Sequence, residues 1–435
     1  MRITENIRKS IFWALDFLKG SPIRAHYNEV KFLVENPQDP KAIEISQKNL
    51  KSLINHASST TDFYKPYQDK SDLQDFPVIN KTIVVENFEA VRSETFKNKK
   101  NYKASTGGST GIPFKIWHDK NKRNRNTADT IYFSELANYE IGRKLVYLRL
   151  WVEKYDKNRM TSLIQNVFKH DVMDSSFEDI ESLLTSITAN SSAKTIMGYS
   201  SFLEHMCTYL KQADFDLSRA NVTSIISIAE YLDEQTRKDL TTFFNTEVYS
   251  RYSNQENGII AQQTKLRPNQ YLINNGSYVV ELLHPDKDEP AELGAWGRIV
   301  VTDLFNYCMP LLRYDTGDLG IVDQLDNGQL AIKDVIGRKF DLIYDTNDQV
   351  IIPHMFYIIW EYSDCKQFQF VQTDKGKYKF RLNTTPHNTD EAGATEFFKT
   401  ILGEDAILDF EYIDEIPQLS SGKRQKVASN YVPNN

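Results

Sequence analysis

The chain has few cysteines, and their spacing excludes both a disulfide framework and a thiolate zinc site. Only three occur in 435 residues (Cys207, Cys308 and Cys365), and no two of them form a C-x-x-C pair. Disulfide-stabilised domains and zinc sites both need several cysteines at short, regular spacings. His205 lies close to Cys207, but no second pair of ligands follows, so we expect Cys207 to be a buried thiol.

Long hydrophobic runs are also absent. The most apolar segment near the N-terminus, residues 11–18 (IFWALDFL), is short and contains Asp16, whereas a membrane-spanning helix needs about 20 apolar residues. The segment has no signal-peptide cleavage pattern either. We therefore expect a cytoplasmic protein without an integral membrane segment. The basic residues before this segment would allow weak contact with a membrane surface, but a packed amphipathic helix is the favoured interpretation.

Basic charge is not in excess. Lys and Arg number 52 against 59 Asp and Glu, which gives a net charge of −7. Nucleic-acid-binding proteins usually carry a concentrated basic face, so no nucleic-acid partner is expected. Two short basic runs, residues 97–103 and 120–125, are interpreted as solvated surface. The alternative is that they attract a polyanion such as a nucleotide.

What is present is an alternation of strand-like and helix-like segments, which is typical of an α/β fold with a largely parallel sheet. Apolar runs predict strands at residues 144–151, 194–197, 223–228 and 247–252. Helical spacing of apolar residues predicts helices at 41–57, 176–187 and 233–244. After residue 338 the pattern changes to short strands and one helix, which predicts a small C-terminal α+β domain over residues 339–435.

Polar segments follow several of the predicted strands. They are residues 198–201 (GYSS), 229–232 (AEYL) and 252–258 (YSNQENG). Because ligands gather at the carboxyl ends of parallel strands, these loops predict one shared site. A glycine- and hydroxyl-rich stretch, residues 104–115 (ASTGGSTGIPFK), is expected on the same rim.

The stretch 104–115 has the composition of a phosphate-binding loop. Glycines allow backbone N–H groups to turn toward an anion, and the neighbouring hydroxyls donate further hydrogen bonds. Neither a Walker loop nor a G-x-G-x-x-G motif occurs in the chain. On these residues alone, a flexible surface turn is an equal alternative.

Five segments in order decide between the two. STGGSTGIPFK (105–115) resembles the phosphate-binding loop of the adenylate-forming superfamily, which comprises acyl-CoA synthetases, peptide-synthetase adenylation domains and luciferases. The other four resemble the superfamily's aromatic-x-x-x-Glu, Y-x-T-G-D, G-R-x-x-D and terminal S-G-K motifs. They are residues 252–256, 314–318, 337–341 and 421–423. Residues 17–30 and 76–88 are most similar to the phenylacetate–CoA ligase branch and its CapK-like members, which are associated with capsular and surface polysaccharide biosynthesis.

This resemblance implies a large N-terminal AMP-binding domain (residues 1–338) with mostly parallel sheets and a small, mobile C-terminal domain (339–435). It also implies ATP and Mg²⁺ as cofactors and a small carboxylic or amino acid as substrate. The residues that would hold the phosphates are Ser105, Thr106, Gly107, Gly108, Ser109, Thr110 and Gly111. The nucleotide would contact Ala229, Glu230, Tyr252, Ser253, Asp318 and Arg338.

Three further roles follow from the resemblance. Glu256 would bind Mg²⁺, with a solvated loop glutamate as the alternative. Lys423 would be the catalytic lysine that bridges the carboxylate and the α-phosphate, although Lys426 is close by and the residues alone do not separate the two. The acid pocket would be formed by Tyr147, Arg149, Trp151, Tyr199 and Ser200.

Two departures from the family pattern concern the second half-reaction. Phe340 stands where the family usually has Asp or Lys, and the following loop (YDTNDQVIIP) has no glycine. The acceptor is therefore open: CoA, a carrier thiol, or an amine on a sugar or amino acid. Two other functions also stay open, an acyl-CoA synthetase like phenylacetate–CoA ligase and a non-catalytic nucleotide-binding partner of a biosynthetic complex.

Overall fold

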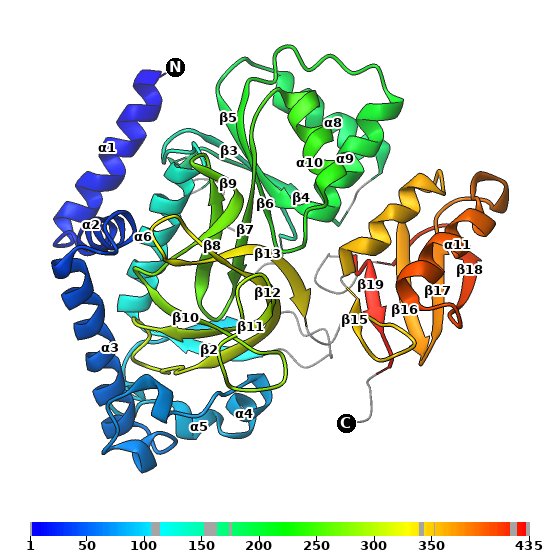
Figure 1. The fold of residues 1–435 in the computed structure, drawn as a ribbon. Helices are drawn as coiled ribbons and strands as arrows, with labels where there is room; N and C mark the ends of the chain where they lie inside the picture. The colour runs from blue at the N-terminus through cyan, green and yellow to red at the C-terminus, as the bar shows by residue number, and fades with distance from the viewer. Residues whose placement is uncertain are drawn as a thin grey trace.

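The computed structural model describes residues 2–105, 114–151, 162, 164–173, 176–338, 343–351, 353–417 and 424–431. It has a large part, up to residue 338, and a smaller part beyond residue 343 (Figure 1). The predicted fold class is confirmed: a large α/β part is followed by a small α+β part. The predicted boundary between residues 338 and 339 adjoins residues 339–342, which lie outside the described residues, and it stays a prediction.

Three helices form one side of the large part: α1 (Arg2–Leu18), α2 (Pro22–Glu35) and α3 (Pro40–Thr60). Asp16, which is 3% exposed, accepts hydrogen bonds from the backbone N–H groups of Ile23 and Arg24. These N–H groups lie in the first turn of α2, where they have no partner within the helix. Asp16 therefore joins α1 to α2, and this is why a carboxylate occurs in an apolar segment.

The expectation that residues 11–18 form a packed amphipathic helix is correct for only one face of α1. Ile11 and Leu15 are about half exposed, and Leu18 is 79% exposed. The packed face instead uses Trp13, whose ring lies edge-on to Tyr27 at 5.7 Å. No helix in the described part of the chain has the length and hydropathy needed to cross a membrane.

An eleven-stranded sheet runs through the large part in the order β10-β11-β12-β13-β9-β8-β7-β6-β5-β3-β4. Strands β4, β3, β5, β6 and β7 pair in parallel, and the other neighbours pair antiparallel. The strands are β3 (Lys144–Arg149), β4 (Val167–Asp171), β5 (Lys194–Tyr199), β6 (Val222–Ile228), β7 (Val248–Asn254), β8 (Gly258–Thr264), β9 (Arg267–Ile273), β10 (Tyr278–Leu283), β11 (Trp296–Asp303), β12 (Tyr314–Gln324) and β13 (Leu330–Arg338).

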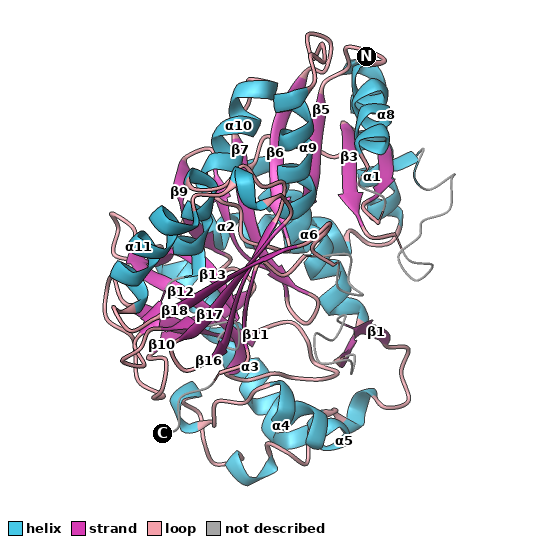
Figure 2. Cartoon of the chain, turned by 90° about the vertical axis from the view of Figure 1, so that its right-hand side faces the viewer, coloured by secondary structure: helices cyan, strands magenta, loops and turns pink. Residues whose placement is uncertain are grey.

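Helices pack beside the parallel half of the sheet (Figure 2). They are α8 (Phe177–Thr188), α9 (Ser200–Gln212) and α10 (Glu234–Phe244). Each follows a parallel strand, so the predicted strand–helix alternation is confirmed. Ser176 and Asp233 cap α8 and α10, because their side chains accept hydrogen bonds from backbone N–H groups in the first turn.

The remaining elements of the large part lie mainly around the antiparallel half of the sheet. They include a two-stranded hairpin, β1 (Tyr102–Ser105) and β2 (Lys115–His118), and the helices α4 (Lys81–Glu86), α5 (Phe88–Val91) and α6 (Lys120–Leu136). Among the described residues of the large part, 3₁₀ helices occur at Lys65–Tyr67, Leu73–Asp75 and Glu94–Phe96.

The interpretation of residues 120–125 as solvated surface is wrong for two of its cations. Lys122 and Arg125 are both 0% exposed. Lys122 lies 2.6 Å from Asp303, and Arg125 lies 2.9 Å from Glu29. A buried charge is stable only when it is paired, so these side chains join α6 to β11 and to α2.

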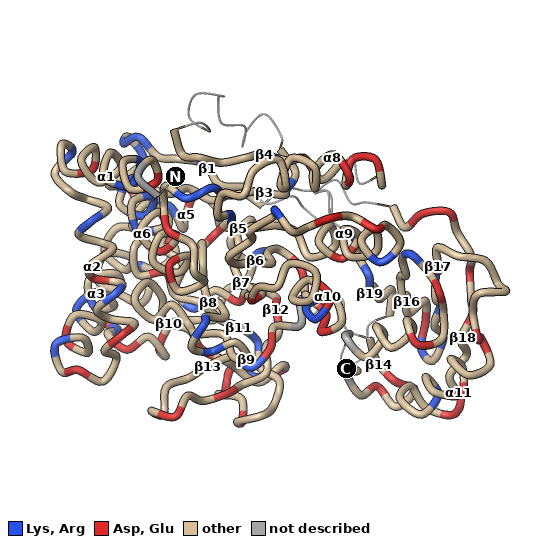
Figure 3. The backbone as a smooth tube through the Cα atoms, turned by 90° about the horizontal axis from the view of Figure 1, so that it is seen from above, with Lys and Arg blue, Asp and Glu red and all other residues tan. Residues whose placement is uncertain are grey.

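The small part has its own sheet, in the order β18-β17-β16-β19, and its own core around Phe356, Phe370, Phe380 and Phe398. Its elements are β14 (Ile343–Tyr344), β15 (Val350–Ile351), η5 (Pro353–Glu361), β16 (Phe368–Asp374), β17 (Lys377–Leu382), η6 (Pro386–Asn388), α11 (Glu391–Leu402), β18 (Ile407–Tyr412) and β19 (Val427–Ser429). Acidic and basic residues are interspersed over both parts (Figure 3). The three cysteines are buried and form no disulfide.

Candidate active site

The glycine–hydroxyl stretch connects the two strands of a hairpin. Ser105 at the end of β1 pairs with Lys115 at the start of β2. The predicted phosphate-binding residues from Thr106 to Gly111 lie outside the described residues, but the positions of the hairpin strands define where the loop begins and ends. Phe114, 1% exposed, lies parallel to the ring of Tyr314, with 6.2 Å between the ring centroids. The loop therefore returns to the fold next to the start of β12.

Glu256 lies beside this hairpin. Its Oε1 accepts a hydrogen bond from the Tyr314 hydroxyl at 3.4 Å, and its backbone carbonyl accepts one from His118 Nε2 at 2.8 Å. Burial lowers the pKa of His118 to about 4, so the imidazole is neutral at pH 7 and donates through Nε2. These contacts hold a carboxylate that is only 7% exposed close to the end of the loop.

Asp318 forms the next part of the site. Its Oδ2 accepts a hydrogen bond of 2.7 Å from the Tyr252 hydroxyl, which also lies 3.1 Å from Thr316 Oγ1. Burial and the Asp318 charge raise the pKa of Tyr252 well above its ordinary value, so the phenol keeps its proton and remains a donor. Arg338 is the register partner of Asp318 across β12 and β13. Gly317, at φ 79°, makes the left-handed turn between Thr316 and Asp318.

Two predicted nucleotide contacts lie at the carboxyl end of β6. Ala229 has a φ of 73°, a left-handed conformation that is uncommon for a residue with a side chain. Glu230 Oε2 accepts a hydrogen bond of 2.9 Å from the backbone N–H of Ser201, in the first turn of α9. This contact gives Glu230 a helix-capping role. Its contact with a nucleotide, and that of the half-buried Ser253, stay predictions.

The predicted acid-pocket residues cluster at the ends of β3 and β5. The rings of Tyr147 and Trp151 meet edge-on at 5.5 Å, and the Arg149 guanidinium lies 5.6 and 5.5 Å from them. Burial is the main cause of the raised pKa of Tyr199, which the nearby Arg149 partly opposes. Ser200 is 3% exposed, with its hydroxyl 2.6 Å from Ser227 Oγ.

Arg251 is a buried neighbour of this cluster that was not predicted. Its Nε donates to Gln262 Oε1 at 2.6 Å and its Nη2 to Ser134 Oγ at 3.0 Å. Burial lowers its pKa to about 10, and Tyr147 partly opposes this shift. The neighbouring residues in the sequence do not show whether Arg251 is buried or lies at the surface of a strand.

Of the two candidate lysines, only Lys426 lies among the described residues. Lys423 lies outside them. Lys426 is described, and its ammonium forms an ion pair with Glu204 on α9. The side chains of both partners are 16% exposed.

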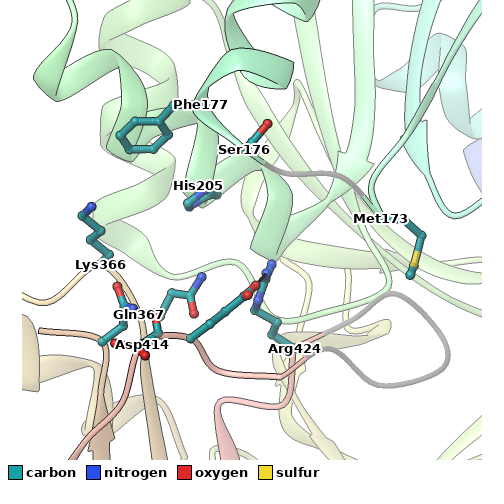
Figure 4. Close-up of a pocket in the computed structure, with 10 residues that line it drawn as sticks. Met173, Ser176, Phe177, His205, Lys366, Gln367, Asp414 and Arg424 are labelled. Atoms are coloured by element: carbon teal, nitrogen blue, oxygen red, sulfur yellow. Dashed lines mark hydrogen bonds and ion pairs between the residues drawn. The ribbon is translucent and has the colours of Figure 1, made fainter.

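A cavity of about 450 Å³ lies beside this ion pair, between the two parts (Figure 4). Phe177 and His205 from the large part face Lys366, Gln367 and Arg424 from the small part. None of the described residues predicted for the site lines this cavity.

The chain was compared with known proteins by sequence and by structure. No protein-family model matches the chain. Protein CapK of Staphylococcus aureus is 22% identical to it over 452 residues, which cover 98% of this chain and 97% of CapK. In structure, 2-hydroxyisobutyryl-CoA ligase in the postadenylation state with R3-HIB-AMP matches with a TM-score of 0.70 at 14% identity, over 90% of each chain. The chain is thus similar to protein CapK over nearly its whole length, and it has the adenylate-forming fold. The resemblance stated from the five motifs is thereby confirmed.

Two further solved structures with bound ligands match the chain. An ATP-bound RpMatB-BxBclM chimera matches with a TM-score of 0.55 at 15% identity, over 74% of this chain and 66% of the chimera. The 2-hydroxyisobutyryl-CoA ligase with 2-HIB-AMP and CoA in the thioesterification state matches at 0.58 and 15% identity, over 89% and 90% of the two chains.

Removal of the Asp318 carboxylate is expected to weaken ATP binding. Hydrogen bonds to a charged group contribute roughly 1.5–3 kcal/mol, so Asp318→Ala should weaken binding of Mg·ATP about tenfold or more if the carboxylate accepts from the ribose hydroxyls. Ribose contacts exist in both ground and transition states, so the loss should appear in ATP affinity. Isothermal titration measures it, with Tyr139→Phe as a control in a buried tyrosine remote from the site. An unchanged affinity would show that Asp318 is only a turn residue.

Proposed function

We propose that this CapK-like chain is an ATP-dependent, AMP-forming ligase that activates a small carboxylic or amino acid as an acyl-adenylate and transfers the acyl group to an acceptor. The observation that carries the proposal is the convergence of four separate motifs. The hairpin of the glycine–hydroxyl loop, Glu256, Asp318 and the end of β13 meet at one place in a fold shared with AMP-forming ligases.

The buried carboxylate of Glu256 suits a magnesium ion. Mg²⁺ prefers oxygen ligands and keeps several waters, so one carboxylate together with phosphate oxygens is sufficient. No group of three or more metal-ligating side chains exists among the described residues, which agrees with a site completed by the nucleotide. Bound there, Mg²⁺ would supply positive charge against the phosphates. Tyr314 and His118 orient Glu256 for that contact.

The proposed reaction begins with attack of a substrate carboxylate oxygen on the α-phosphorus of ATP. A bond forms between that oxygen and phosphorus, the bond to the bridging oxygen breaks, and pyrophosphate leaves. The protein needs only to position the reactants and offset the repulsion between anions. Tyr252 and Asp318 would hold the ribose, backbone N–H groups of residues 106–111 the β- and γ-phosphates, and Lys423 the reacting groups.

The acid would enter beside Tyr147, Trp151 and Arg149. The two rings present apolar faces, and the guanidinium between them offers one cationic partner for a polar substituent. The alternative for Arg149 is a structural arginine with no substrate contact, although β3 is not an edge strand because it pairs with both β4 and β5. A role in capsular or surface polysaccharide biosynthesis is proposed from the similarity to protein CapK.

Free CoA is expected to be a poor acceptor. Phe340, which lies between the two parts in the sequence, and a loop from 344 to 353 without glycine would crowd a channel that must admit a pantetheine arm. With Mg·ATP and an acid that is turned over, we expect an amine or a carrier-bound thiol to discharge the adenylate faster than CoA. Mass spectrometry of the products measures this. Rapid acyl-CoA formation at micromolar CoA would contradict the expectation and support an ordinary acyl-CoA synthetase.

The second candidate function is a non-catalytic nucleotide-binding partner, because the proposed ribose and metal positions would also allow a protein to bind ATP without turnover. One assay distinguishes the ligase from this binding partner. A ligase releases pyrophosphate in an acid-dependent manner, whereas a binding partner retains ATP affinity without turnover.

A further inference from the structure

The contact between the two parts contains a part-buried ion pair, in which each side chain is 16% exposed. Glu204 lies on α9 of the large part, and Lys426 lies just before β19 of the small part. Burial raises the pKa of Glu204, with Lys426 opposing the shift and Asp233 and Glu230 adding to it. Glu204 therefore lies near two further carboxylates of the large part and is paired with a lysine supplied by the small part.

The small part packs aromatic side chains around the same lysine. The Lys426 ammonium lies 4.7 Å from the centroid of the Tyr357 ring and 5.7 Å from that of Phe368. Tyr357 in turn meets Tyr231 of the large part edge-on at 5.7 Å. A cation over aromatic faces gains electrostatic attraction and is kept from bulk water. The ammonium is thus held in place before it meets Glu204.

We propose that Lys426 and Glu204 form a latch that holds the small part against α9 in the arrangement that forms the adenylate. Lys426 is then a positioning residue and not the catalytic lysine, a role that rests on the proposed function. The nearer match of the whole chain to a ligase in its postadenylation state than in its thioesterification state agrees with this arrangement. When the parts separate, water can reach Glu204 and Lys426 again, so the pair favours one arrangement without locking it.

The latch predicts how strongly different variants reduce the population in which the two parts are docked. Removing one partner of a buried pair leaves an uncompensated charge, whereas removing both is often nearly neutral. Lys426→Met should therefore reduce the docked population most, by roughly tenfold or more, because the Glu204 charge stays buried. Glu204→Gln should have a smaller effect, since the rings still hold the ammonium. The double variant should recover much of the loss relative to Lys426→Met, and Lys426→Arg should stay close to wild type.

The experiment measures the distance between the two parts directly. The native cysteines are buried, so cysteines introduced at the exposed Lys238 and Glu396 can be labelled selectively. Distance distributions from paired spin labels are recorded for the full chain with Mg·ATP alone. Lys211→Met is the matched control, because it removes another lysine of an ion pair, the one between Lys211 on α9 and Asp239 on α10, and Lys211 is 51% exposed. This control should leave the distribution unchanged.

The outcomes separate the latch from the proposed function. A shift to longer or broader distances in Lys426→Met, recovered in the double variant, supports the latch even if no acid is turned over. An identical distribution in wild type and Lys426→Met overturns it, even if the wild type forms adenylates. A lower melting temperature with unchanged distances would assign the pair a structural role only, which also overturns the latch. Should Lys426→Met fail to fold, Glu204→Gln, which preserves shape, supplies the same comparison.

Discussion

Replacing Lys423 by alanine is expected to lower the rate of adenylate formation by roughly two orders of magnitude or more. The ammonium is proposed to bridge the incoming carboxylate and the α-phosphate, a contact that strengthens as charge develops in the transition state. Losing such a contact lowers kcat and leaves ATP affinity nearly intact. Acid-dependent pyrophosphate release measures the rate, and titration with Mg·ATP measures the affinity.

Two control variants sharpen this prediction. Lys377→Ala removes an exposed lysine from the same part of the chain and should have no effect. Lys426→Met should also reduce the rate, but through the arrangement of the two parts, so its defect should be recovered in the double variant with Glu204→Gln. Equal turnover by Lys423→Ala and wild type would transfer the catalytic role to Lys426 or remove it from both lysines.

Exchanging Glu256 for glutamine is the second change with a large expected effect. The shape is retained, but a neutral amide oxygen is a much weaker ligand for Mg²⁺ than a carboxylate oxygen. We expect adenylate formation to fall about a hundredfold, in the range found for loss of one electrostatic contact to the transferring group. Excess Mg²⁺ should recover part of the rate, because mass action offsets the weaker site.

The matched control for Glu256→Gln is Glu292→Gln, an exposed position at which the same charge is lost. Its rate and magnesium dependence should equal those of wild type. A Glu256→Gln variant with an unchanged magnesium dependence would show that the carboxylate does not bind the metal, and that its contact with Tyr314 is structural.

Helices and strands whose apolar residues follow a regular spacing could be predicted from the sequence. The parallel strands near residues 144, 194, 223 and 248 are short apolar runs, and two of the helices between them, α8 and α10, have polar caps at their first turns. Local patterns of this kind determine secondary structure with little help from the rest of the chain.

Contacts between distant residues could not be predicted in the same way. Lys122 and Arg125 belong to a run of basic letters that resembles solvated surface, and only their partners Asp303 and Glu29 explain their burial. The same holds for Arg251 and Ser134, which are 117 positions apart. A single sequence shows the type of each side chain, whereas burial depends on which remote segment packs against it.

The two lysines near the C-terminus, Lys423 and Lys426, show the same limit of prediction from sequence at the candidate active site. The motif at residues 421–423 distinguishes Lys423 from Lys426 by resemblance alone. The ion pair between Lys426 and Glu204 gives the second lysine a separate role, and these two residues are 222 positions apart in the sequence. No local pattern around either residue indicates the other.

The most direct test of the central claim is pyrophosphate release from the wild-type chain with Mg·ATP and a panel of carboxylic and amino acids. An adenylate-forming ligase is expected to release pyrophosphate only when a suitable acid is present, with AMP and not ADP as the nucleotide product once an acceptor is added. ATP binding without acid-dependent pyrophosphate release across the panel would contradict the proposed ligase activity and favour a nucleotide-binding partner.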